Sequence, residues 1–459
     1  MGARKLIFFT LGQVGMMMLA RFFFQWILDF AAAPGGGSNE ALFPAATVGA
    51  VLLGFRIFDG VTDPVAGLLG DRWVRNGRPR QQLLWTAFLI PSVGLALTFA
   101  PTHAMPELTR WLFLLAGMFV FFVGYTFYAI PYWSLVDDYA GNDPEARTRL
   151  SNLLGAGLLI ATGLGFVGSP ILVELLGYRD AGLVFAVTAI PLMTLPYFAA
   201  PDDTDASSDA DDADADAGAG GDAGAGADAP PPPPSPSTPT GLEPLKLALT
   251  DARFLAVIVL FGGSQMSLTI MTAAAPFIAV DLLGGSSGDV ALLLGPLLAT
   301  ALPLMLFTPA LSRRWGWRRA VVAATAALAV IYGGTGVLGG TLLVSPLVTA
   351  ALLFACGGPM IAVLLGLEGE AITECARQRS PGVVSMYFGV YNFVVKALNG
   401  LAIFVAGYLA QQARGAWGVE AFRAMSATAG AALLVGFAAY LLAQRAIPAA
   451  PRSASTPAP

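Results

Sequence analysis

The sequence contains few charged residues and almost no histidine or cysteine. Only 12% of its 459 residues are charged, against about 25% in a typical soluble domain, and its mean hydropathy is +0.68. It has one histidine and two cysteines, and it lacks the H-E-x-x-H zinc motif and the phosphate-binding G-K-[ST] motif. The low charge excludes a soluble protein. The missing chemistry argues against an enzyme, and we expect no organic cofactor, no resident metal and no nucleic-acid partner.

Long apolar runs fill most of the chain and are long enough to cross a bilayer. They fall into two sets of six, at 6–30, 42–69, 82–100, 111–136, 151–176 and 181–200, and at 253–282, 289–311, 320–340, 343–367, 382–409 and 422–444. The sequence therefore predicts an all-α integral membrane protein whose twelve transmembrane helices form two six-helix bundles, residues 1–200 and residues 251–446.

The segment between the two sets has a different composition. Residues 201–240 are rich in Asp, Ala and Gly and then in Pro, so they cannot bury a core. We predict a disordered linker over residues 201–250, with a short interfacial helix at its end, and a tail over residues 447–459. Lys and Arg are concentrated in the termini, the linker and alternate loops. This pattern predicts a protein of the cell's inner (plasma) membrane whose two termini both lie on the cytoplasmic side.

Two basic loops with tryptophan occur six spans apart. The first reads D-R-W-V-R-N-G-R-P-R after the second span, and the other reads S-R-R-W-G-W-R-R after the eighth. Equivalent loops suggest a duplicated six-span unit. We interpret them as a cytoplasmic gate, although both are also explained as ordinary positive-inside loops. The candidate gate residues are Asp71, Arg72, Arg78, Arg80, Arg313 and Arg318.

The second span carries charges in the middle of an apolar run. Arg56, Asp59 and Asp63 follow one face of a helix. Ionised groups at this depth usually face a bundle interior and mark an ion or substrate path. The alternative, that Arg56 and Asp59 form only a packing pair, leaves Asp63 without a role. We therefore predict an ion-coupling site.

Depth along the helices brings further residues to this level. At about 1.5 Å per residue, Asp59, Thr126 and Lys396 lie at similar heights near the midplane. Arg56 and Lys396 would form a charge network with the two aspartates, and Asp59, Asp63, Thr62 and Thr126 would offer oxygens to Na⁺. A proton on one carboxylate is equally compatible with the sequence. Either threonine hydroxyl can instead bond back to its own helix.

Aromatic residues crowd the first and fourth spans. Trp133, two residues after a proline, could stack on a substrate ring, and Tyr125 lies on the same span. An aromatic stripe of this kind also fits simple core or lipid packing. Arg21, deep in the first span, has no obvious partner in its own helix, so it either binds an anionic substrate group or pairs with a carbonyl.

The motif R-I-F-D-G-V-T-D-P, together with Y-T-F-Y-A-I-P-Y-W-S-L-V, R-T-R-L-S and Y-N-F-V-V-K, resembles the glycoside–pentoside–hexuronide:cation symporter family, which includes melibiose permease and belongs to the major facilitator superfamily. The resemblance implies a twelve-helix fold with alternating access. It also implies cation binding by Asp59, Asp63 and Thr126, a charge network with Lys396, and sugar contact by Trp133.

Three sugar-recognising charges of that family are missing. Their positions hold Met17, Ala129 and Gly155. We therefore expect a secondary active transporter, acting as a monomer, that couples Na⁺ or H⁺ to symport of a small organic solute other than a disaccharide. A proton-coupled exporter and a carrier of lysolipids or other amphiphiles are the alternatives within the same class. A receptor built on a transporter-like body is an alternative from a different class.

Overall fold

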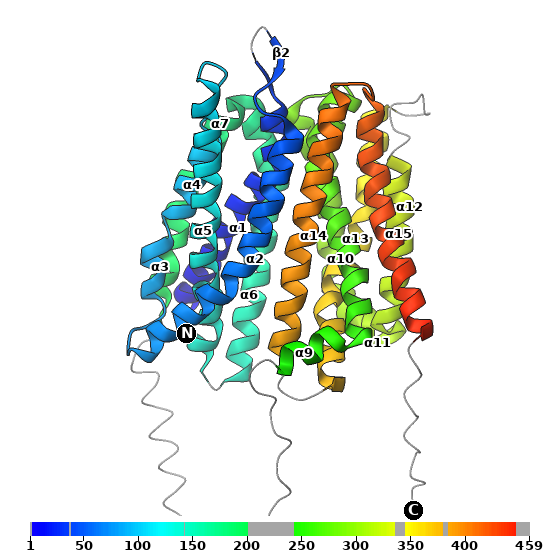
Figure 1. The fold of residues 1–459 in the computed structure, drawn as a ribbon. Helices are drawn as coiled ribbons and strands as arrows, with labels where there is room; N and C mark the ends of the chain where they lie inside the picture. The colour runs from blue at the N-terminus through cyan, green and yellow to red at the C-terminus, as the bar shows by residue number, and fades with distance from the viewer. Residues whose placement is uncertain are drawn as a thin grey trace, which may run out of the picture.

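The computed structural model describes residues 2–35, 38–141, 143–200, 243–335, 345–379 and 384–446. The predicted disordered segment, 201–240, and the tail, 447–459, lie outside these residues. The described chain is almost entirely helical, and most helices run roughly parallel to one another (Figure 1).

The first half of the chain fills one side of the molecule in Figure 1. Its elements, in chain order, are α1 (Ala3–Ala32), β1 (Pro34–Gly35), β2 (Ser38–Ala41), α2 (Ala45–Arg75), α3 (Gln82–Ala87), α4 (Ile90–Thr98), α5 (Glu107–Ala140), α6 (Pro144–Gly163), η1 (Leu164–Gly168), α7 (Ser169–Thr194) and η2 (Leu195–Ala199). Strands β1 and β2 form a small antiparallel hairpin at one end of the bundle.

The second half fills the other side. Its elements are α9 (Glu243–Thr250), α10 (Ala252–Phe277), η3 (Ile278–Leu282), η4 (Ser287–Asp289), α11 (Val290–Trp315), α12 (Trp317–Thr335), α13 (Pro346–Arg379), α14 (Val384–Ala413) and α15 (Glu420–Ala446). The short helix predicted at the end of the linker is α9, which lies across the lower end of α10 and α14 in Figure 1.

Within the described residues, nine helical stretches are long and apolar enough to cross a membrane. One of them, 55 residues long, contains Gly177 with φ 77° and ψ 171°. Glycine adopts such a positive φ without strain. Two helices therefore meet there across a kink, where the sequence predicts the break between the fifth and sixth spans. The α3–α4 segment and α12 fall short of the same criterion, so the count of twelve stays a prediction.

Helices α2 and α14 meet along the junction of the two halves, because glycines let their backbones approach. A Cβ on Gly49 would lie 2.9 Å from the Cα of Phe404, and a Cβ on Gly407 would lie 2.5 Å from the carbonyl oxygen of Ala45. Small residues at such crossings allow close helix packing in membranes. This packing sets the distance between the charges of α2 and those of α14.

The two ends of the molecule differ in how the halves are joined. We name the end that carries the α2–α3 and α11–α12 loops the basic-loop end. At the opposite end, the Ser286 hydroxyl donates to Glu174 (3.0 Å), and the backbone N–H of Ala46 donates to the side-chain oxygen of Gln411 (3.1 Å). At the basic-loop end, the ion pairs of Arg80, Arg147 and Arg318 each stay within one half.

Candidate functional site: a charged cluster beside a central cavity

Asp59 on α2 is the most enclosed charge of the site. Its side chain is 1% exposed, and its two oxygens have three partners. Thr126 on α5 donates its hydroxyl to Oδ1 (2.7 Å), while Arg56 Nη1 and Lys396 Nζ lie 3.1 and 3.0 Å from Oδ2. Buried carboxylates require such compensation, since removal from water penalises an unpaired charge.

Lys396 on α14 links the two halves. Besides Asp59, its Nζ donates to Oδ2 of Asp63, so one ammonium group joins two carboxylates of α2. Gly400, one helical turn further along α14, permits this approach, because a Cβ there would lie 2.9 Å from the Cβ of Arg56. We name Arg56, Asp59, Asp63, Thr126 and Lys396 the midplane cluster.

The midplane cluster is electrically balanced. Two basic and two acidic side chains lie in contact, and the guanidinium of Arg56 also lies 4.8 Å from the centre of the Phe24 ring, a favourable cation–π distance. An added cation could bind here only if it displaced Lys396 from a carboxylate or gave the midplane cluster a net positive charge. The arrangement can therefore exchange one cation for another.

Thr62 does not face the carboxylates with its hydroxyl. The hydroxyl donates to the backbone carbonyl of Asp59 in its own helix (3.1 Å). The Thr62 hydroxyl thus bonds back to its own helix, which is one of the two arrangements that the sequence allows for either threonine. The Thr126 hydroxyl instead contacts the carboxylate of Asp59. Among the described residues, no three His, Cys, Asp or Glu side chains form a transition-metal site.

A cavity of about 520 Å³ lies between the two halves and is lined by the whole midplane cluster. Apolar side chains from both halves line it, and those of α11 and α13 include Leu298, Leu302 and Leu365. The cavity is large enough for a small organic solute. The fold thus places a charged cluster beside a binding chamber.

Two of the aromatic residues singled out in the sequence line the cavity. Trp133 donates its indole N–H to Oε1 of Gln13 (3.1 Å), which fixes the ring at the cavity edge. Tyr125 stacks near Phe121 with ring centres 6.0 Å apart, and its hydroxyl contacts the sulfur of Met17 (3.6 Å). Both therefore present ring surface to the cavity while their polar atoms have partners.

Arg21 on α1 also lines the cavity, but it lies outside the midplane cluster. Its guanidinium carbon is 5.6 Å from the centre of the Phe166 ring, and its buried Nε has no hydrogen-bond acceptor. Among the described residues, no backbone carbonyl accepts a hydrogen bond from Nε of Arg21, so its role stays a prediction.

Apart from Lys396, the polar residues that the second half contributes to the cavity are not singled out by the sequence analysis. Glu368 on α13 accepts a hydrogen bond from Nε2 of Gln265 (2.8 Å), and Thr269 donates to Asn399 (2.9 Å). All four line the cavity. The tenth predicted span ended at residue 367, whereas α13 continues to Arg379, so Glu368 lies well inside a helix rather than in a loop.

The first candidate gate loop is bonded within its own half. Arg80 donates to Asp138 at the end of α5 (2.9 Å) and to Asp71 at the end of α2 (3.2 Å). Arg78 lies over the ring of Trp73, 4.6 Å from its centre. Arg72 is exposed, and no ion pair of this residue occurs among the described residues.

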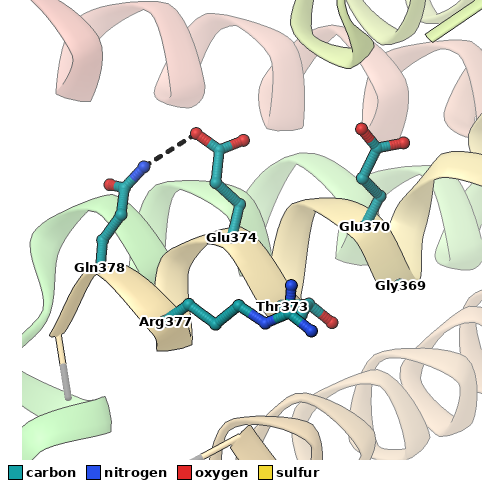
Figure 2. Close-up of a pocket in the computed structure, with 6 residues that line it drawn as sticks. All are labelled: Gly369, Glu370, Thr373, Glu374, Arg377 and Gln378. Carbon is teal, nitrogen blue, oxygen red and sulfur yellow. Dashed lines mark hydrogen bonds between the residues drawn. The ribbon is translucent and has the colours of Figure 1, made fainter. Parts of the chain in front are cut away.

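The second candidate gate loop has an equivalent bond. Arg318 at the start of α12 donates to Glu374 near the end of α13 (3.1 Å), and Glu374 also accepts from the Trp317 indole. Glu374 lines a hollow of about 500 Å³ formed along α13, shown in Figure 2 with its hydrogen bond from Gln378. Arg313 is exposed and has no ion pair within the described ranges.

Two helical halves around a central charged cavity are the architecture of a membrane transporter. Residues 6–402 match the Major Facilitator Superfamily, and the chain belongs to this superfamily. Its members are transporters and not enzymes, and the apolar helices make the chain a multi-pass membrane protein.

Two curated relatives carry symporter names. The chain is 29% identical to the uncharacterized symporter sll1374 of Synechocystis sp. over 168 residues, covering 33% of this chain and 28% of that protein. It is 28% identical to the putative glycoside/cation symporter YagG of Escherichia coli over 162 residues, covering 34% of this chain and 35% of that protein. Each match spans a minor part of the relative. The resemblance to cation symporters that the sequence motifs predict is confirmed at this level.

Solved structures share the fold at low sequence identity. A bacterial homologue of the human lysosomal transporter Spinster, in an inward-facing and occupied conformation, has a TM-score of 0.65 at 14% identity and covers 97% of this chain and 96% of that one. The nucleoside transporter NupG has a TM-score of 0.65 at 14% identity, with coverage of 96% and 99%. These likenesses support the predicted superfamily fold.

Proposed function

We propose that this transporter is a symporter that couples a cation, Na⁺ or H⁺, to the movement of a small organic solute. The observation that carries the proposal is the position of Asp59, where one buried carboxylate contacts a hydroxyl donor, an arginine and a lysine from the other half of the molecule. Occupation of this carboxylate by a cation would change both the local charge and the link between the halves.

The mechanism follows from the competition for the carboxylates. A bound Na⁺ would be held by oxygens of Asp59, Asp63 and Thr126, and a bound proton would neutralise one aspartate. Either event weakens the hold on Lys396, which frees α14 to shift relative to α2. Solute bound in the adjacent cavity, against Trp133 and Tyr125, would then move with the cation.

The orientation belongs to this proposal as well. Most basic residues outside the spans lie at the basic-loop end and at the termini, so we assign that end to the cytoplasm of an inner or plasma membrane. Because the bonds between the halves lie in the middle and at the opposite end, the conformation is typical of an inward-facing state. We propose that the monomer is the functional unit, since each chain holds a complete cluster and cavity.

A carrier of lysolipids or other amphiphiles, with a proton as the coupling ion, is a second candidate. The observation that favours it is the apolar wall of α11 and α13, which would accept a hydrocarbon group. Export and import use the same cluster, so the two directions share the tests below.

Thermal unfolding of the purified protein tests the cation site. A ligand that binds only the folded state stabilises it, by about 2.7 kcal/mol at one hundred times its Kd. We expect Na⁺ at fixed pH, or a change of pH without Na⁺, to shift the unfolding midpoint of the native protein. Asp59→Asn should abolish the Na⁺ shift, or lose the part of the pH shift that Asp59 contributes, and Glu107→Gln, an exposed carboxylate at the start of α5, should leave the response unchanged.

Asp63→Asn provides a second variant in case the first does not fold. An unchanged cation response in both aspartate variants would refute the site.

A further inference from the structure

Most of the charged residues that line the cavity neutralise one another in the midplane cluster, and two lie outside this cluster. Arg56 and Lys396 neutralise Asp59 and Asp63 inside the midplane cluster. Among the described lining residues, the other charges are Arg21 on α1 and Glu368 on α13. They belong to different halves of the molecule, and neither forms an ion pair within the described part of the chain.

Among the described residues, Arg21 makes a cation–π contact and forms no ion pair. Its guanidinium lies over Phe166, and Gly165 makes room for it, because a Cβ at that glycine would lie 2.5 Å from the Cβ of Arg21. The buried Nε lacks an acceptor. A guanidinium is well suited to bind a carboxylate or phosphate, since it offers two parallel donors.

Gln25 provides a second and independent sign of a ligand on the same wall. It lies one helical turn from Arg21, lines the cavity, and is only 2% exposed, yet neither its Nε2 nor its Oε1 has a hydrogen-bond partner. An unsatisfied buried amide is destabilising, because it has lost its hydrogen bonds to water without replacement. A polar group of a bound solute would satisfy it.

Glu368 gives the opposite wall an anionic group. It accepts a hydrogen bond from Gln265 (2.8 Å) and interacts with the hydroxyl of Tyr391, both neutral groups, and no described Lys or Arg lies within 4 Å of it. The neighbouring pair of Thr269 and Asn399 adds hydroxyl and amide groups to this wall. The wall is suited to a cationic group such as an ammonium.

We propose that the transported solute is a zwitterion with an apolar portion. Its anionic group would bind Arg21 and Gln25, its cationic group would bind Glu368, and its apolar portion would lie against Leu298 and Leu302. A neutral sugar would leave both charges unpaired, and a simple anion would leave Glu368 unpaired. Only a zwitterion satisfies both walls without adding net charge, so the midplane cluster remains free for the coupling cation.

This inference rests on the proposed function, because it assumes that the cavity is a transport site. The test uses thermal unfolding of the full-length protein with phenylalanine, leucine and O-butanoylcarnitine as zwitterions. The matched probes are 3-phenylpropanoate as the anion, 2-phenylethylamine as the cation and phenyl β-glucoside as the neutral compound. We expect at least one zwitterion to bind at least ten times more tightly than any of the matched probes.

Substitution then assigns the two walls. Arg21→Gln should weaken the zwitterion and the anion but not the amine, and Glu368→Gln should weaken the zwitterion and the amine but not the anion, each by roughly tenfold or more. Both variants should keep the Na⁺ response of the native protein, or the part of its pH response that Asp59→Asn loses. Glu107→Gln is the control and should bind all probes as the native protein does.

Several results would overturn the proposal. They are the absence of stabilisation by any zwitterion, equal or tighter binding of the glucoside or of a singly charged probe, and loss of the cation response in Glu368→Gln, which would make Glu368 part of the coupling site. If zwitterions bind while the cation response is absent in the native protein, the solute class stands and cation coupling fails.

Discussion

The midplane cluster and the basic-loop end use the same residue types for different purposes. At the basic-loop end, Arg80 pairs with acids of α2 and α5, and Arg318 pairs with an acid of α13, so each ion pair stays inside one half. In the midplane cluster, Lys396 of one half pairs with Asp59 and Asp63 of the other. Two internally braced halves are therefore connected by a charge link, which the proposed coupling cation would replace.

The largest effect is expected from removing the link itself. Lys396→Met leaves two carboxylates facing one arginine, and loss of one partner from a buried ion network costs about 3–5 kcal/mol. Because Na⁺ or a proton can take the place of the lysine, added Na⁺ should restore part of the stability, and the loss should shrink as the pH falls. Unfolding of the purified variant across a series of Na⁺ and pH values measures both.

Lys396→Arg is the matched control for that variant, since it keeps the charge. A Lys396→Met protein as stable as the native one, with no greater response to cations, would show that the link carries no energy.

Removing the hydroxyl ligand of Asp59 should have the next largest effect. Thr126→Val keeps the shape but loses a hydrogen bond to a charged group, worth about 1.5–3 kcal/mol. The apparent cation affinity should fall by about tenfold, which corresponds to 1.4 kcal/mol. Titration of the unfolding midpoint with cation gives the affinity.

Thr162→Val is a suitable comparison for Thr126→Val. Thr162 also lines the cavity, but its hydroxyl donates to the carbonyl of Leu158 in its own helix (2.8 Å). Equal losses in the two variants would mean that the Thr126 hydroxyl has no special role.

The braces at the basic-loop end should contribute less. Arg80→Ala removes two ion pairs near solvent and should lower the free energy of unfolding by about 1 kcal/mol, while Arg318→Ala should lower it less because half of that side chain is exposed. Neither variant should alter the cation affinity. A changed affinity in Arg80→Ala would mean that the braces and the midplane cluster do not act separately.

The smallest effect is expected at Thr62. Its hydroxyl bonds to its own helix, so Thr62→Val should cost at most about 0.5 kcal/mol and leave the cation affinity within threefold of the native value. A tenfold loss of affinity, measured in the same titration, would make Thr62 a ligand in another conformation.

Much of the midplane cluster could be predicted from the sequence, because charges in apolar helices are rare and their depth follows from helical rise. Asp59, Thr126 and Lys396, expected at similar heights, are in contact. The halves of the fold follow from the same apolar runs. The choice between the two roles of Thr62 could not be predicted, since it depends on a rotamer.

The second wall of the cavity could not be predicted for a different reason. Glu368, Glu370 and Glu374 look like a charged loop after an apolar run, yet α13 continues through them to Arg379. A helix that extends beyond the apolar run carries acids that the sequence assigns to solvent. The lack of partners for Arg21 and Gln25 likewise depends on packing between helices that are distant in sequence.

The central claim is that a cation at Asp59 loosens the link between the halves. Double electron–electron resonance, which measures the distance between two spin labels, tests it directly. Cys356 and Cys375 are first replaced by alanine. Labels are then attached at Arg149→Cys on α6 and Arg377→Cys on α13, which are both exposed positions. The distance between the labels reports the separation of the halves at the basic-loop end. We predict that Na⁺, or a lower pH, changes the distance distribution and that Asp59→Asn removes this response. An identical response in Asp59→Asn would contradict the account.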